Sequence, residues 1–181
     1  MYDGYNKIFW GIFIATFNIK LGMIKILPAF IGFMIILSGI SSLYRETNIE
    51  PFNKAKTFSI ILIIGTGIGE LMGLLSIEPT NFFIFNEIWI VFNIIMEMLM
   101  FYKCFEGSIE YFNVNNYENL AEENIKKVRF YIIALTIDII FLNFALIFDI
   151  RYLNTIVAIM IIILRIYLMV LTYRFRNVFT E

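Results

Sequence analysis

Four ionisable residues interrupt long apolar runs, and they are the residues of this sequence that could do chemistry. They are Arg165, Asp138, Glu97 and Glu70. A charged side chain at the centre of a membrane helix costs roughly 2.5–3.5 kcal/mol, so each of these groups is expected to meet a partner or water. A guanidinium in such a place can bind an anionic group, and a carboxyl can carry a proton or bind a cation.

Other kinds of chemistry lack the residues they need. The chain of 181 residues contains no histidine and one cysteine, Cys104. The commonest general base and metal ligand are therefore missing, and neither an internal disulfide nor a zinc pattern can form. Because no nucleophile–base pair, metal motif or phosphate loop is recognisable, we expect no enzyme activity, no metal and no cofactor. The net charge of −1 gives no reason to expect nucleic acid as a partner.

Composition and apolar runs place the chain in a membrane. Hydrophobic residues make up 60% of it and charged residues 16%, against about 25% charged residues in soluble domains. Several runs approach the roughly 20 apolar residues that cross a bilayer as a helix. We predict an all-α polytopic membrane protein, a single integral domain with a bundle of six transmembrane helices surrounded by lipid. The predicted spans are about 6–24, 27–43, 57–77, 86–104, 129–149 and 152–173.

The first predicted span is the weakest, and the distribution of lysine and arginine orients all six. Only Ile8 to Ile19 is free of charge in that span, so Lys20 is expected at a membrane interface. If the first two segments instead form one re-entrant hairpin, the later spans keep the same orientation. Ten of the fourteen basic residues fall beside the termini or in the second and fourth loops, which predicts cytoplasmic termini. They are Lys7, Arg45, Lys54, Lys56, Lys103, Lys126, Lys127, Arg129, Arg174 and Arg176.

The longest predicted loop, 105–128, contains a short helix of its own. Asn115 and Glu118 have the spacing of a capping box, in which two side chains close the first turn of a helix. We therefore predict a cytoplasmic helix at about 115–127 that continues directly into the fifth span.

Depth along the helices suggests a partner for Arg165. Arg165 precedes Arg174 by nine residues and Asp138 follows Arg129 by nine, so both lie about 13 Å from the predicted cytoplasmic face. The fifth and sixth spans should pack as an antiparallel hairpin, which makes Asp138 the first candidate partner. With one arginine for three carboxyl groups, at least one carboxyl is expected to be protonated or hydrated.

Polar residues recur at helical spacing on one face of each of the last four spans. We therefore expect spans three to six to enclose a polar site of Asp138, Arg165, Glu97 and Glu70. The aligned residues are Ser59, Thr66, Glu70 and Gly73; Trp89, Asn93, Glu97, Met100 and Cys104; Ala134, Asp138, Phe141 and Ala145; and Asn154, Ala158, Arg165 and Thr172.

Small residues mark surfaces where helices can approach closely. Gly65, Gly69 and Gly73 follow the four-residue spacing that brings two membrane helices backbone to backbone, and Gly11 with Ala15 repeats it more weakly. We expect close packing within one molecule rather than a dedicated dimer interface.

Two resemblances bear on localisation. The segment KILPAFIGFMIILSGISSL, from Lys25 to Leu43, resembles one in small uncharacterised bacterial multi-pass membrane proteins that read ILPxFIGY, with Phe33 in place of the tyrosine. The resemblance implies the bacterial inner membrane and no particular activity. In size and hydropathy the chain is also similar to the substrate-binding subunits of energy-coupling-factor transporters, whose small-residue motif is matched only in part by Gly11 and Ala15.

Two functions fit these features. The first is a small-solute or ion binding or transport component, in which Arg165 receives an anionic or zwitterionic solute. Glu97 or Glu70 would then exchange protons or bind a cation, and Asn93 and Asn154 would add polar contacts. The second is a non-transporting regulatory, immunity or assembly subunit, in which the buried charges hold the helices in place and another membrane protein is the partner.

Overall fold

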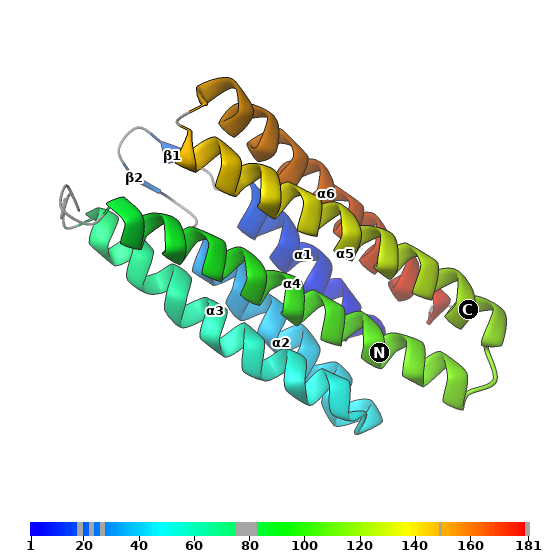
Figure 1. Cartoon of the computed structure of the whole chain (residues 1–181). Coiled ribbons are helices and arrows are strands. Elements are labelled where there is room, and N and C mark those ends of the chain that lie inside the picture. Colours follow the sequence, from blue (N-terminus) through cyan, green and yellow to red (C-terminus); the bar gives the residue numbers. More distant parts are fainter. Residues whose placement is uncertain (18–19, 22–23, 26–27, 75–82, 149, 180–181) are drawn as a thin grey trace.

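The computed structural model describes residues 1–17, 20–21, 24–25, 28–74, 83–148 and 150–179. Over these residues the chain forms six helices, with a short antiparallel pair of two-residue strands between the first and second (Figure 1). The elements are α1 (Tyr2–Thr16), β1 (Lys20–Leu21), β2 (Ile24–Lys25), α2 (Ala29–Thr47), α3 (Glu50–Leu74), α4 (Phe83–Val114), α5 (Glu118–Ile147) and α6 (Arg151–Val178).

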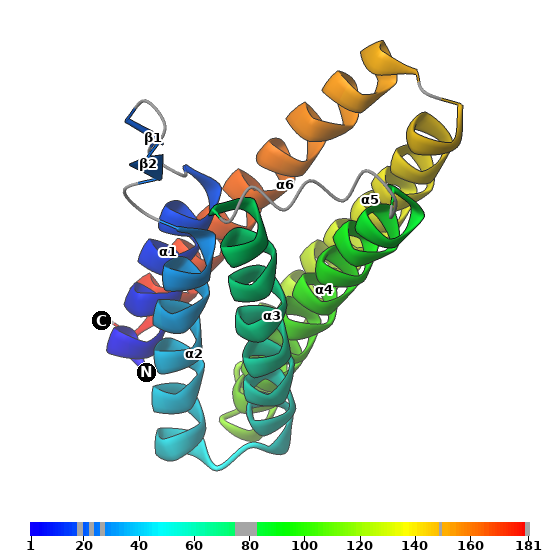
Figure 2. The same cartoon turned by 90° about the vertical axis from the view of Figure 1, so that its left-hand side faces the viewer.

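The six helices form a closed ring. Each helix packs against the next along the chain, and α6 packs against α1 (Figures 1 and 2). Because successive helices alternate in direction, both termini lie at one end of the bundle, with the α2–α3 and α4–α5 connections. We call this the terminal end. In the described residues, all helices except α1 are long and apolar enough to cross a membrane, which confirms a polytopic helical membrane protein.

The structure corrects the predicted first span. α1 ends at Thr16 rather than near residue 24, and Lys20 lies in β1. With 15 residues, α1 is about 22 Å long, which is less than the hydrocarbon thickness of a typical bilayer. The first predicted span, which has only a short stretch free of charge, therefore forms a shorter helix than predicted.

The predicted loop helix is part of a longer element. α4 continues to Val114, and α5 begins at Glu118 and runs without a break into the fifth span, as expected. The predicted capping box is wrong, because Asn115 donates its side-chain amide to Tyr111 O and the residue that precedes α5 is Tyr117. Asn116 has a φ of 62°, a left-handed conformation that asparagine tolerates and that commonly ends helices.

The closest helix contact joins α1 and α2 through glycines spaced seven residues apart. An added Cβ at Gly32 would lie 2.6 Å from both Ala15 N and Gly11 O, and one at Gly39 would lie 2.6 Å from Gly4 O. The weak Gly11–Ala15 signal therefore marks a real backbone-to-backbone contact. The more regular glycine spacing in α3 does not mark a backbone-to-backbone contact, because the described glycines of this series face side chains of α4. Gly65 faces Asn93, Gly69 lies near Trp89, and Gly73 is outside the residues whose surroundings are described.

Aromatic side chains fill the interior of the ring at the terminal end. Phe175 of α6 is buried and stacks on Tyr5, Phe105 and Phe112, with ring centroids 5.5–5.6 Å apart. The Tyr5 hydroxyl donates a hydrogen bond of 2.7 Å to Ser108 Oγ across the ring. This half of the bundle is a packed core, and the outer faces of the helices expose isoleucine and phenylalanine, as expected for lipid contact.

The glycine contact predicts an asymmetry between two alanine substitutions. Gly32→Ala forces backbone atoms of α1 and α2 apart and should lower the free energy of unfolding by about 1–3 kcal/mol. Gly67→Ala is the matched control, because an added Cβ there has no neighbour within 4 Å. Thermal unfolding midpoints of the two detergent-solubilised variants measure the difference. Equal midpoints would contradict the close contact.

Candidate functional site

Arg165 of α6 forms a two-pronged ion pair with Glu97 of α4. Arg165 Nε donates to Glu97 Oε1 at 2.9 Å, and Nη2 donates to Oε2 at 2.6 Å. The two side chains are 22% and 11% exposed, so most of the pair is removed from solvent. Paired geometry of this kind gives the strongest arginine–carboxylate contacts, and the desolvated surroundings make loss of either partner costly.

A third helix also takes part in this contact. Arg165 Nη1 donates a hydrogen bond of 3.1 Å to Ala15 O, in the last turn of α1. Carbonyl groups in the last turn of a helix lack partners within the helix and carry the negative end of its dipole. One guanidinium therefore joins α6, α4 and α1 across the interior of the ring.

Asp138, the predicted partner of Arg165, is not in this contact. Its side chain is buried on α5, where its Oδ2 atom has no hydrogen-bond partner in the described part of the chain. α5 and α6 do pack as neighbours, as expected, but Arg165 extends across the ring to α4. Equal depth on adjacent helices was therefore insufficient to identify the pair, because the rotation of each helix decides which neighbour a side chain faces.

Glu70 of α3 meets the first turn of α2. Its Oε1 accepts a hydrogen bond of 2.8 Å from Ala29 N, and Pro28, the residue at the cap position, contributes no side-chain bond. A carboxylate is favoured there because the first amide groups of a helix lack partners and carry positive partial charge. Glu70 therefore supplies from a neighbouring helix the cap that α2 does not supply itself.

Asn93 of α4 is fitted against α3. Its Nδ2 donates to Trp89 O at 2.7 Å, and its Oδ1 lies against Gly65, where an added Cβ would approach to 2.4 Å. No donor reaches this buried Oδ1 among the residues described. A polar atom without a partner in a membrane interior is costly, so a donor from water or a solute would be favourable here.

These side chains line one cavity of about 330 Å³ in the half of the bundle away from the termini. Four of the six predicted site residues, Arg165, Glu97, Asn93 and Glu70, are brought together in its wall, and Asp138 and Asn154 are not among the lining residues. Nor is any residue of α5, whereas α1 and α2 contribute residues that the sequence did not indicate. These are Ala15, Ala29 and Phe33.

Small or apolar side chains carry no polar signal in a sequence, which explains why the contribution of α1 and α2 was missed. Ala15 takes part through its main-chain carbonyl and Ala29 through its amide. Metal ligation receives no support, since the described residues contain no cluster of three or more His, Cys, Asp or Glu side chains that could hold an ion.

Comparisons with family models, curated proteins and solved structures give no match for this chain. The cavity and its charged wall are therefore the basis for a proposed function.

The ion pair predicts which charge exchange restores folding. Arg165→Glu and Glu97→Arg each place like charges together and should lower the free energy of unfolding by at least about 3–5 kcal/mol. Combining them should recover much of the loss. Membrane accumulation and the thermal midpoint after extraction measure the recovery.

The exchange of Asp138→Arg with Arg165→Asp is the matched control. It is expected to give no recovery, because Asp138 lies outside the hydrogen-bond network of Arg165. Recovery in this control, or none in the Glu97 exchange, would overturn the assignment of the pair.

Proposed function

We propose that this protein binds a small solute or ion in the cavity beside Arg165 and acts as a component of a transport process in the bacterial inner membrane. The observation that carries the proposal is a cavity of about 330 Å³ whose wall holds an ion pair and a further carboxyl within membrane-spanning helices. Ionisable groups at this depth usually face water-filled paths or bound substrates, since lipid contact is unfavourable.

The guanidinium in the wall suits an anionic or zwitterionic solute. Among the described lining residues, Arg165 is the one base, and Glu97 and Glu70 are the acids. Within the described part of the chain, three of the five guanidinium N–H groups are used, two by Glu97 and one by Ala15 O, which leaves two for an oxygen of the solute.

The direction of access follows from the filled core at the terminal end. Stacked aromatic residues occupy that half of the ring, and the cavity lies in the other half. With the termini in the cytoplasm, as the basic residues predict, a solute reaches the cavity from the opposite face of the membrane. The protein would then capture solutes from outside, and passage inward would require the aromatic core to rearrange.

The alternative, a non-transporting regulatory, immunity or assembly subunit, is favoured by one feature of the same site. The pair of Arg165 and Glu97 is well hydrogen-bonded and links three helices, so it can serve as a structural contact alone. The alternative requires a dry interior and a membrane protein that co-purifies in fixed ratio. The transport role requires a hydrated cavity and a small molecule that is released when the purified protein is denatured.

Cysteine labelling tests whether the cavity is hydrated. In a Cys104→Ala background, which lacks other thiols, Asn93→Cys should react with a membrane-impermeant maleimide added at the face opposite the termini. Ile163→Cys, 51% exposed on the outer face of α6 at similar depth, is the matched control. We expect labelling at least about tenfold faster at Asn93, because the reactive thiolate does not form in hydrocarbon. Equal rates would refute a water-accessible cavity.

A further inference from the structure

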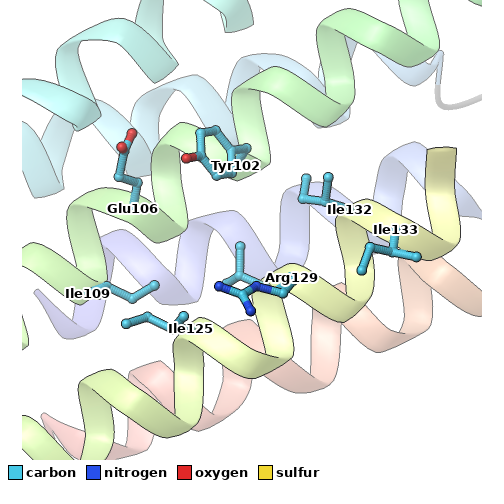
Figure 3. A pocket seen from close by; sticks show the side chains of 8 residues that line it. Tyr102, Glu106, Ile109, Ile125, Arg129, Ile132 and Ile133 are labelled. Atoms are coloured by element: carbon cyan, nitrogen blue, oxygen red, sulfur yellow. The ribbon is translucent and has the colours of Figure 1, made fainter.

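A second hollow of about 330 Å³ lies between α4 and α5 and shares no lining residue with the cavity (Figure 3). We call it the α4–α5 groove. Figure 3 shows Ile109 of α4 and Ile125 of α5 facing each other across it, with the Arg129 side chain lying among the isoleucines. The lining residues are Tyr102, Glu106, Ile109, Ile125, Val128, Arg129, Ile132 and Ile133.

Most of the described lining residues of the groove are apolar, and one of them, Arg129, carries a positive charge that no described carboxylate pairs. Arg129 is exposed, and its guanidinium has no hydrogen bond or ion pair within the part of the chain that the structure describes. The acidic lining residue, Glu106, is already paired with Lys103 one turn earlier on α4, so its charge is balanced. Lys126, exposed on the same stretch of α5, follows Glu122 by one helical turn, so the positive charge of the groove is that of Arg129. An anionic group is therefore the complementary partner.

Arg129 lies where the charged first part of α5 gives way to its apolar part, which is where a lipid phosphate is expected. Charged residues precede it on α5, and the chain from Phe130 onward is apolar and exposed on its outer face. Ile132 and Ile133 continue the groove from Arg129 toward the centre of the membrane. A molecule with an anionic head and a hydrocarbon tail would place each part against matching side chains.

We propose that the α4–α5 groove binds one acidic phospholipid, with its phosphate at Arg129 and an acyl chain along Ile132 and Ile133. The guanidinium presents paired N–H donors that match two phosphate oxygens. This site does not depend on the solute cavity, because it lies outside the ring and on different side chains.

Native mass spectrometry of the full-length protein in detergent tests the proposal. The probes are palmitoyl-oleoyl phosphatidylglycerol and palmitoyl-oleoyl phosphatidylcholine, which carry the same acyl chains on an acidic and a neutral headgroup. The wild type should retain the acidic lipid preferentially. Arg129→Gln should weaken its retention about fivefold, the effect of one basic residue near a lipid surface. Arg45→Gln, an exposed arginine in the last turn of α2, is the charge-matched control and should have no effect.

A second variant separates the groove from the charge. Ile133→Trp fills the hollow without changing any charge, and it should also release the acidic lipid while leaving the thermal midpoint of the delipidated protein unchanged. Equal retention of both lipids, or equal weakening by Arg45→Gln, would show general attraction to anionic surfaces and overturn the site. The proposal would also be overturned if a second copy of the chain or another protein co-purifies with the wild type and is lost in the Ile133→Trp variant.

Discussion

A guanidinium inside the membrane-spanning part of the bundle is costly unless it is hydrogen-bonded, and the contacts that Arg165 makes join three helices of the fold. It binds Glu97 through two hydrogen bonds and the main-chain carbonyl of Ala15 through a third. These contacts connect α6 to α4 and α1. The ring is therefore stabilised by hydrogen bonds across its interior as well as by packing between neighbouring helices. Because the bracing groups are polar and extended, the interior around them is not closed by apolar packing, and a cavity remains beside the pair.

The glycine contact between α1 and α2 supports the same arrangement. Gly32 is packed directly against Ala15 N and Gly11 O, which holds the end of α1 beside the beginning of α2. The last turn of α1 thus presents a carbonyl group beside an amide group of the first turn of α2. Arg165 satisfies the first and Glu70 the second, so opposite charges on α6 and α3 stabilise two adjacent helix ends. The polar wall of the cavity is in this sense a set of helix caps supplied from neighbouring helices.

The sequence predicted the class of fold and most of the polar wall, but it assigned the ion pair wrongly. Apolar runs give the number of helices, and helical spacing places Glu97, Asn93, Glu70 and Arg165 on inward faces, because both depend on one helix at a time. Which carboxyl meets Arg165 depends on how two helices rotate and cross, and spacing along each helix does not contain that information. The same reason hides the α1–α2 contact, whose glycines recur every seven residues and match only when the two helices are aligned antiparallel.

The long helix α4 separates the two sites by its geometry. Glu97 and Glu106 are nine residues apart, which at 3.6 residues per turn places them on opposite faces and about 13 Å apart along the axis. Each carboxylate is balanced by a base, Arg165 inside the ring and Lys103 on the outer side. Glu97 and Glu106 therefore add no unbalanced negative charge beside the cavity or the groove. Within the described residues, two guanidinium N–H groups of Arg165 and the guanidinium of Arg129 have no partner, and α4 places the proposed solute site and the proposed lipid site on its opposite faces.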